Sequence, residues 1–442
     1  MTFCKAIIAV ALCLVFSLAG DRARAQGLIR DAEIERTLSL LSDPLFNAAG
    51  LSPSTVNLFI LNDRSLNAFV ASGRNIFLNT GLLIDLETPE ELQAVIAHEI
   101  GHITGGHIAR RAIKLRNAQG PAIIGALAGI AVAAAGGGAA GAAISAGSQG
   151  ALIRDILRHS RAEEASADQA ALNYLRRSNI DPSGLKRVFE RFKGQEAFTV
   201  GNVDPYAVTH PLSAQRLQLI DRRLSELEPG ATPRNQEHAY WHGRMRAKLD
   251  GFLSNPERVL SVLDRQEESE FSLYARAIAL HRAPAPKEAI EATDRLIARR
   301  PNDPFYIELK GQILFETGNA AAAAPLYREA SRLAPNEPLL KAGLGRALLA
   351  LNDPASDKEA LRVLQDARRA DMADAAGLRD LATAYSRAGD YGMATLVTAE
   401  RHALRGDRKN AILQARRASS LLPEGSPGWL RAQDILSLRV DD

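Results

Sequence analysis

Apolar residues at helical spacing are clearest in the stretch that begins at Thr88. Residues 92–96 place leucine, valine and isoleucine on one side of a helix. The start of that helix is also marked, because Thr88 is a good N-cap, Pro89 suits the first helical position and Glu91 completes a capping box. The pattern therefore predicts a helix from Pro89 through residue 102.

A second pattern, in the C-terminal half, repeats every 34 residues. Small residues stand at positions 8, 20 and 27 of a unit that starts at Pro304, and a proline stands at position 32. The residues are Gly311, Ala323, Ala330 and Pro335, with Ala277, Ala289 and Pro301 one period earlier and Gly345 one period later. Small residues let the two helices of a hairpin approach closely, and proline ends the second helix. The pattern resembles the tetratricopeptide repeat and predicts an all-α superhelix; a generic alanine-rich bundle is the alternative.

The details of this array can also be predicted. A weak first unit with Trp241 starts near residue 236. After Pro338 the period slips by about three residues, which we interpret as a loop insertion at residues 352–354. Further hairpins are expected around Tyr385 and Ala411.

The first of two long apolar stretches covers residues 6–16 and follows Lys5. Residues 23–25 (A-R-A) then have the form of a signal peptidase site, so residues 1–25 are predicted to be a cleavable secretory signal. An uncleaved anchor is disfavoured because the run is shorter than the ~20 residues that span a bilayer. Both cysteines lie in this segment, so the exported chain would have no disulfide and no sulfur metal ligand.

The second apolar stretch, residues 117–153, contains no charged residue and is rich in glycine and alanine. We interpret it as a helical hairpin that covers a functional site or rests on a membrane or partner surface. Internal packing and a transmembrane hairpin are the alternatives, since small apolar residues are also ordinary helix-packing material.

The length of 442 residues indicates two or three domains, at roughly 100–200 residues each. A polar stretch with proline and glycine at residues 228–235 divides the exported chain into residues 26–230 and 236–442. The 54 Lys and Arg nearly balance the 51 Asp and Glu, and no long basic run occurs, so no nucleic-acid partner is predicted. Two apolar stretches are too few for a polytopic membrane protein.

The helix predicted from Pro89 carries H-E-I-G-H at residues 98–102. His98 and His102 are four residues apart, so their rings lie on one face and can bind a single zinc ion. Glu99 is rotated by about 100° from His98 and lies beside the metal, where it can accept a proton from zinc-activated water. That chemistry is what attack on a peptide carbonyl requires. Two unrelated surface histidines are disfavoured, because H-E-x-x-H on a capped helix is rare by chance.

A catalytic zinc site needs a third protein ligand and leaves the fourth position for water. The segment from Ser160 to Asp168 offers two glutamates on a helix predicted to run toward Tyr174. Glu164 and Asp168 are four apart, which suits one ligand and one carboxylate that orients a histidine N–H. Spacing alone leaves Glu163 as a competing ligand.

H-E-I-G-H followed about 60 residues later by S-R-x-x-E-x-x-A-D resembles the HtpX-like zinc peptidases, which include the CAAX prenyl endopeptidases. Residues 67–69 with 79–83 are similar to the strand pair that precedes the catalytic helix, and residues 210–216 to a later His-Pro…Arg segment. The resemblance covers most of residues 30–225. It implies an α+β zincin-like (gluzincin) peptidase domain, mostly helical with a small sheet.

For the site, the resemblance implies one Zn²⁺ per chain, held by His98, His102 and Glu164 in preference to Glu163. With the signal and the repeats added, the chain is similar to a soluble periplasmic branch of the family. That branch implies unfolded or misassembled proteins as substrates and the outer-membrane assembly machinery as a partner.

Three roles compete for His210. It can donate a hydrogen bond to the oxyanion of the intermediate, or it can be a plain turn histidine before a proline. The resemblance implies a third role, as a fourth zinc ligand that keeps the enzyme latent. Two catalytic roles are candidates for Arg216, which are orienting Asp168 and orienting the intermediate. An ordinary surface salt bridge is the alternative.

Three other histidines are not predicted as ligands. His107 is five residues past His102 and is expected to point away from the metal face. His159 and His242 have no matching partners and are expected to be exposed.

Asn67, Ala68 and Phe69 belong to a stretch of strand, continuing to Leu78, that is a plausible sheet edge. An extended substrate can add to such an edge through backbone hydrogen bonds, which do not depend on sequence. Such binding suits unfolded or stalled clients.

These features together predict an exported zinc metalloendopeptidase that degrades misfolded or stalled envelope and outer-membrane proteins and docks to partners through its repeats. It is expected in the periplasm, with peripheral membrane contact through residues 117–153 as an option. One rival is a periplasmic chaperone or scaffold with little proteolysis, against which Glu99 argues, because a structural zinc site needs no base. The other is an integral membrane protease with residues 117–153 as a hairpin span.

Overall fold

A computed structural model describes residues 27–71, 73–110, 160–192, 206, 209–210, 213–226 and 234–437. The predicted signal peptide and the apolar stretch at residues 117–153 lie outside these residues. Within the described part of the chain, no helix is both long enough and apolar enough to cross a membrane.

The N-terminal half contains a four-stranded sheet with the order β1-β2-β4-β3. The strands are β1 (Leu28–Ile29), β2 (Asn57–Leu61), β3 (Ala68–Ala71) and β4 (Asn75–Asn79). β2 and β4 are parallel and the other pairs antiparallel, so β3 is an edge strand while β4 has neighbours on both sides. The Asn67 carbonyl accepts a hydrogen bond from the Asn79 N–H. Because the pairing alternates along a strand, the backbone groups of Ala68 and Val70 point to the free edge.

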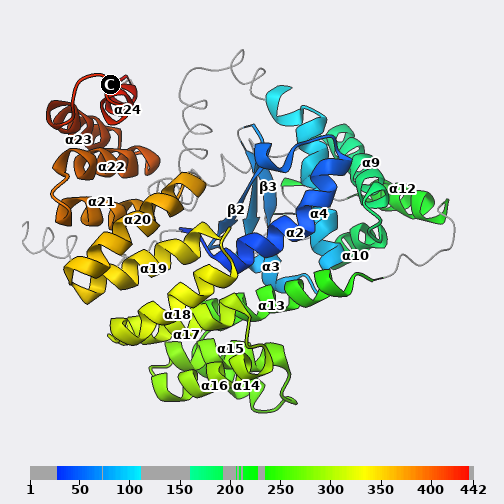
Figure 1. The fold of residues 1–442 in the computed structure, drawn as a ribbon. Coiled ribbons are helices and arrows are strands. Elements are labelled where there is room, and N and C mark those ends of the chain that lie inside the picture. The colour runs from blue at the N-terminus through cyan, green and yellow to red at the C-terminus, as the bar shows by residue number, and fades with distance from the viewer. Residues whose placement is uncertain are drawn as a thin grey trace, which may run out of the picture.

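Helices pack around this sheet, with α4 at their centre (Figure 1). They are α2 (Ala32–Ala48), α3 (Thr80–Asp85), α4 (Pro89–Thr104), α9 (Arg161–Arg177), α10 (Ser183–Phe192) and α12 (Ala214–Ser225). A 3₁₀ turn, η1 (Pro53–Thr55), precedes β2. α4 contacts α2, α9, α10 and β3, and all of its residues from 91 to 102 are buried. The predicted helix is confirmed, and so is its capping box between Thr88 and Glu91.

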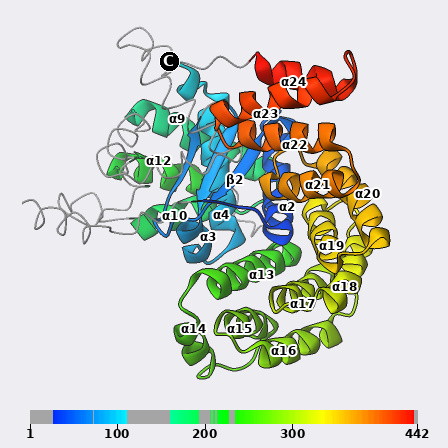
Figure 2. The ribbon, with the colours of Figure 1, turned by 90° about the vertical axis from the view of Figure 1, so that its left-hand side faces the viewer.

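The C-terminal half is an array of helical hairpins, as the 34-residue period predicted. The helices are α13 (Gln236–Leu253), α14 (Pro256–Leu263), α15 (Glu270–Arg282), α16 (Pro286–Arg299), α17 (Pro304–Glu316), α18 (Ala320–Leu333), α19 (Pro338–Leu351), α20 (Pro354–Ala370), α21 (Ala375–Arg387), α22 (Tyr391–Leu404), α23 (Arg408–Leu421) and α24 (Pro427–Leu436). Figures 1 and 2 show an arc that begins below the sheet at α13 and rises to α24. The small residues have the predicted use, since a Cβ at Gly345 would lie 2.4 Å from Leu364 of the facing helix.

The predicted loop insertion at residues 352–354 is wrong. α20 starts at Pro354, which is 34 residues after the start of α18 at Ala320, so this loop has the usual length. The extra residues lie inside α20, which has 17 residues where α16 and α18 have 14. Three residues are close to one helical turn, so they lengthen the helix while roughly keeping its packing face.

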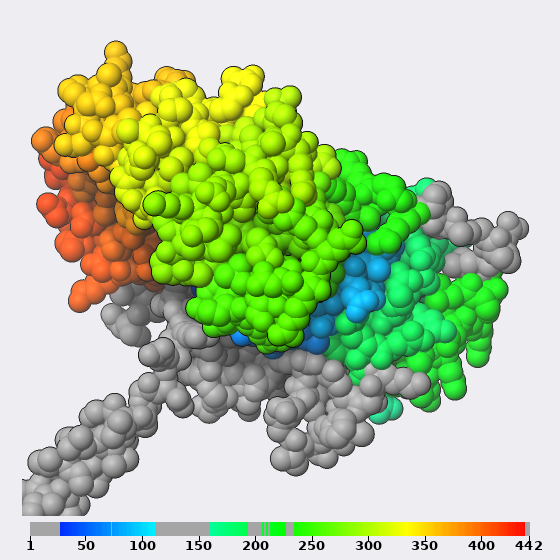
Figure 3. Space-filling view, turned by 90° about the horizontal axis from the view of Figure 1, so that it is seen from below, coloured from blue at the N-terminus to red at the C-terminus, as the bar shows by residue number. Residues whose placement is uncertain are grey.

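α13 packs on both halves of the molecule. Its Met245 and Leu249 belong to the apolar core of the N-terminal half, and the helix also packs on α15. Figure 3 shows the green residues of the first hairpins directly against the blue residues of the N-terminal half. The polar stretch at residues 228–235 therefore separates two sequence patterns, whereas the packing continues across it.

Candidate metal centre

Two helices bring the predicted site residues together. α4 carries His98 and His102 one turn apart, and α9 carries Glu164 and Asp168 one turn apart. The helices can approach because α4 has Gly101 at the crossing, where a Cβ would lie 2.8 Å from the Ala167 carbonyl oxygen. The sequence thus provides a close helix crossing at the point where the donors meet.

Glu163, the competing ligand, is used elsewhere. Ser160 is the N-cap of α9 and accepts from the Glu163 N–H, while the Glu163 carboxylate accepts from the Ser160 N–H at 3.0 Å. This capping box holds Glu163 at the half-exposed end of the helix, whereas Glu164 is fully buried. The structure therefore directs Glu164, and not Glu163, toward the histidines.

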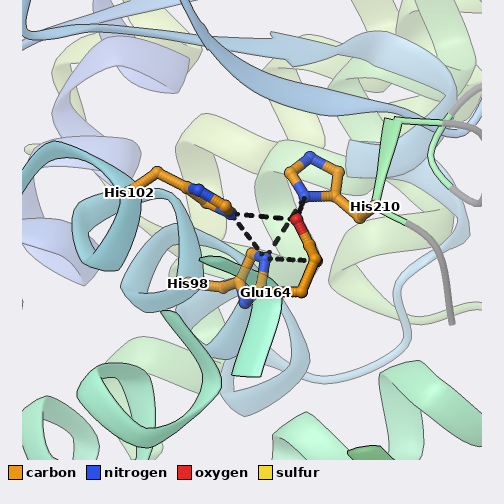
Figure 4. Close-up of side chains that lie close together, drawn as sticks. All are labelled: His98, His102, Glu164 and His210. Carbon is orange, nitrogen blue, oxygen red and sulfur yellow. Dashed lines mark hydrogen bonds and ion pairs between the residues drawn. The ribbon is translucent and has the colours of Figure 1, made fainter. Parts of the chain in front are cut away.

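Four buried side chains offer donor atoms to one point: His98, His102, Glu164 and His210 (Figure 4). His98 Nε2 lies 3.1 Å from His102 Nε2, 3.2 Å from His210 Nδ1 and 3.3 Å from Glu164 Oε2. Glu164 Oε1 lies 3.3 Å from His102 Nε2 and 3.2 Å from His210 Nδ1.

These distances fit a metal ion. Four donors arranged tetrahedrally at 2.0–2.1 Å from one ion would be about 3.3 Å apart. The donor set, three imidazole nitrogens and a carboxylate, is also one that a divalent ion accepts. The four residues could therefore hold a single metal ion.

The ring nitrogens of the two α4 histidines that face away from this point have their own partners. His98 Nδ1 lies 3.0 Å from Asp168 Oδ1. The Arg216 guanidinium donates a hydrogen bond to each oxygen of Asp168, both at 2.7 Å. Burial alone would raise the pKa of Asp168, but Arg216 and His98 outweigh it and the pKa is lowered. An ionised Asp168 then orients His98. Arg216 is buried and also reaches Glu164 at 2.8 Å, so the surface salt bridge considered for it does not apply.

His102 Nδ1 lies 2.9 Å from His107 Nδ1, a contact that the sequence analysis missed. His107 is not among the four donors, but it does not point away from the site either. The helical projection failed because α4 ends at Thr104 and Gly106 has a φ of +64°, which turns the chain back. The Gly105-Gly106 pair was the available signal.

His210 contacts the site through both nitrogens. Nδ1 faces the donor group, and Nε2 lies 3.2 Å from the Ala68 carbonyl on the free edge of β3. Its ring lies against Tyr206, with the ring centres 4.7 Å apart. The residue is fully buried, so it is not an exposed turn histidine.

Glu99 lies beside the donor group without belonging to it. Its Oε1 is 3.4 Å from His210 Nε2, and the side chain is fully buried. Burial raises the pKa of Glu99, and the nearby His210 and His98 offset only part of that shift. A buried carboxyl with a raised pKa can both take up and return a proton.

The expected exposure of His242 is wrong. It lies on α13 and is 2% exposed, because that helix packs on the N-terminal half. Burial, with Arg246 and Arg234 nearby, lowers the pKa of His242 to about 3. His159 lies outside the described residues.

An H-E-x-x-H helix joined by a buried carboxylate from a second helix defines the class of metal-dependent peptidases. Residues 29–224 match the sequence model of peptidase family M48, so the chain carries an M48 domain and is a metalloendopeptidase.

Comparison with known proteins found two kinds of relative: some match most of the chain, and others match less than half of it. The chain is 26% identical over 409 residues to the beta-barrel assembly-enhancing protease of Yersinia pestis. The aligned region covers 90% of this chain and 82% of that protein. It is 26% identical over 407 residues to the protein of the same name from Escherichia coli K12, with 90% and 81% covered. Metalloprotease LoiP of Escherichia coli K12 is 29% identical over 203 residues, which cover 44% of this chain and 72% of that protein.

Proposed function

We propose that the chain is a zinc-dependent periplasmic endopeptidase that degrades misfolded or stalled envelope and outer-membrane proteins. The observation that carries the enzymatic part is the group of four buried donors with Glu99 beside it. The relatives that cover most of the chain are named for beta-barrel assembly, which supports this class of client.

The proposed organisation has three parts. Residues 1–25 are a cleaved signal, residues 26–230 a gluzincin-type peptidase domain, and residues 236–442 a tetratricopeptide-repeat domain that docks partners. Peripheral contact with the outer membrane through residues 117–153, which lie outside the described residues, is an option within this proposal. The helical hairpins from α13 to α24 support the repeat assignment.

In this proposal His98, His102 and Glu164 hold one zinc ion, for which imidazole and carboxylate donors are usual. When bound, the ion acts as a Lewis acid that activates water and polarises a carbonyl. Glu99 takes a proton as general base and delivers it to the leaving amine as general acid, as its raised pKa favours. Asp168, fixed by Arg216, keeps the His98 ring oriented.

The edge of β3 that has no partner strand is the proposed substrate site. Its residues are buried, and the backbone of Val70 hydrogen-bonds to Glu99, so a substrate would replace the present contacts. An extended segment would pair with the backbone groups of Ala68 and Val70 that point to this edge. The contact from His210 Nε2 to the Ala68 carbonyl occupies the same position. We therefore propose that His210, as a fourth ligand, holds the enzyme latent and that substrate binding displaces it.

A second function, a periplasmic chaperone or scaffold with little proteolysis, has one observation in its favour. With His210 among the donors, the fourth position that a catalytic site leaves open is filled. A chain that stays in this state would bind clients without cutting them.

Casein cleavage by residues 26–442 separates the two functions. Zinc-loaded protein is expected to cleave casein, and Glu99→Gln is expected to lose at least about 100-fold in rate, because general acid–base catalysis is removed. The variant should keep its zinc, since Glu99 is not among the donors. Equal inertness of both proteins and of His210→Ala, together with improved client folding, would establish the scaffold function and refute the proposed proteolysis.

A further inference from the structure

An open cavity of about 480 Å³ lies between α21, α22 and α23. Figure 2 shows these three helices near the C-terminal end of the array. This volume is in the range of ligand pockets in proteins. Its lining includes Arg379, Arg387, Arg401 and Arg417 but no aspartate or glutamate. The remaining polar lining consists of hydroxyl and amide side chains and one tyrosine. The side chains that line the cavity therefore carry positive charge and no negative charge.

Some arginines elsewhere in the array are paired with acids on neighbouring helices. Arg328 binds Glu359 at 2.9 Å, and Arg368 binds Glu400 at 3.2 Å. In the cavity wall, Arg387 and Arg379 each have one acidic partner, which are Asp357 and Asp380.

Arg401 and Arg417, the other two arginines of the wall, form no ion pair with any carboxylate of the described residues. Arg401 is half-buried, and burial together with Arg405 and Arg379 lowers its pKa, with only Asp380 acting against them. Holding a cation in this position destabilises the free protein, which an anionic ligand would offset.

The hydroxyl groups in the wall indicate what else the ligand carries. Thr383, Thr395 and Thr398 donate their hydroxyl protons to carbonyls of their own helices, at 2.7–3.2 Å. Their oxygens can then only accept, so they favour a ligand with several donor groups. Inorganic phosphate has only one or two O–H groups near neutral pH, whereas a peptide has an N–H at nearly every residue. Tyr391, which is 63% exposed at this wall, adds an aromatic surface for side chains.

We propose that this cavity, the arginine groove, binds an extended acidic segment of a partner protein. Arg401 and Arg417 bind its carboxylates, and the threonine hydroxyls accept from its backbone amides. The inference rests on the proposed docking role of the repeats, but it does not depend on proteolysis.

Fluorescence anisotropy on the full chain carrying Glu99→Gln tests the groove. The probes are a labelled nine-residue peptide with four glutamates and the same peptide with glutamines instead. We expect only the glutamate peptide to bind, with a Kd that rises with NaCl, and Arg401→Gln or Arg417→Gln to weaken it by about tenfold or more. Arg416→Gln is the matched control, because Arg416 is an exposed arginine of α23 outside the cavity wall, and it should bind normally.

Equal binding of the two peptides, or no binding of either, would overturn the proposal. Binding of inorganic phosphate or of phosphatidylglycerol vesicles without the glutamate peptide would also overturn it and would assign the groove to a small anion or a lipid surface. Thermal unfolding checks that the variants are folded. Arg401→Gln removes a cation that lies among like charges, so its Tm should be no lower than that of wild type. The catalytically inactive background keeps the result separate from the proposed peptidase activity.

Discussion

His210 is the residue at which the proposed latency and the proposed catalysis compete. A neutral imidazole has one N–H, and the Nε2 contact with the Ala68 carbonyl requires that proton. Nδ1 then presents a lone pair to the donor group, as a metal ligand must. The hydrogen bonding of this ring is therefore consistent with a fourth ligand.

His210→Ala is expected to raise casein cleavage several-fold, because it opens the fourth position and frees the Ala68 carbonyl for substrate. Zinc content, measured by atomic absorption, should stay near one per chain, since three donors remain. A fall in the cleavage rate at unchanged zinc would show instead that His210 serves the oxyanion.

His107 is expected to tune the metal site through His102. Burial lowers the pKa of His107, which keeps the ring neutral and able to accept a hydrogen bond from His102 Nδ1–H. Loss of such a partner typically costs ten- to a hundredfold in metal affinity. His107→Phe should therefore weaken zinc binding about tenfold in a chelator competition, whereas His107→Asn, which keeps an acceptor, should retain more. Unchanged affinity in both variants would leave His107 a packing residue.

At the scale of elements, the crossing of α4 and α9 depends on Gly101. A Cβ there would meet the Ala167 carbonyl oxygen at 2.8 Å and its Cα at 2.9 Å, and backbone atoms cannot rotate away. Gly101→Ala should push α9 outward, and Glu164, three residues before Ala167, should move with it. We expect a loss of about 1–3 kcal/mol in stability, measured by urea unfolding, and weaker zinc binding.

The matched control for Gly101→Ala is Thr104→Ala, which alters the exposed end of the same helix. It removes the hydroxyl contacts with Tyr174 and with two carbonyls of α4, but no metal-site contact. This variant should keep its zinc affinity. If Gly101→Ala binds zinc as tightly as wild type, the close crossing is not what positions Glu164.

Elements with strong local signals could be predicted from the sequence. α4 starts where Thr88, Pro89 and Glu91 indicate, because a cap is a local interaction. The choice between Glu163 and Glu164 was also open to local analysis, since Ser160 and Glu163 form the S-x-x-E pattern of a capping box.

The errors have three different causes, and only the first is packing between distant segments. His242 is buried because α13 packs on the N-terminal half, and no local pattern indicates that contact. His107 approaches His102 only because the chain reverses at Gly106. The three extra residues of α20 extend a helix instead of a loop, and either position gives the same period downstream.

At the scale of the whole molecule, a buried ionic network joins the two halves. Glu33 of α2 binds Arg244 at 2.6 Å and Lys248 at 3.3 Å, both on α13, and accepts from Tyr274 of α15 at 2.5 Å. Arg244 also pairs with Asp303 at the start of α17. Removing one member of such a network is strongly destabilising, because it leaves a buried charge without its partner. The network therefore fixes the first hairpins on the peptidase half.

Glu308 of α17 makes this junction sensitive to pH. Burial, with Asp31, Glu33 and Glu316 nearby, raises its pKa to about 7, and Lys248 offsets only part of the shift. The folded chain therefore holds a proton on Glu308 between about pH 4.5 and 7, where the unfolded chain has lost it. The contribution of Glu308 to the free energy of unfolding therefore falls as the pH rises through this window. Above about pH 7 the buried carboxylate is ionised and the loss of stability is complete.

Glu308→Gln copies the protonated form, so the variant should have a higher Tm than wild type at pH 8 and the same Tm near pH 5. Lys248 keeps its partners in the variant, since Asp31 lies 2.7 Å from it and Glu33 3.3 Å. Glu291→Gln, on the exposed side of α16, is the control and should follow wild type at both pH values. A Tm gap that does not narrow on acidification would mean that Glu308 is ionised throughout and that Lys248 alone balances it.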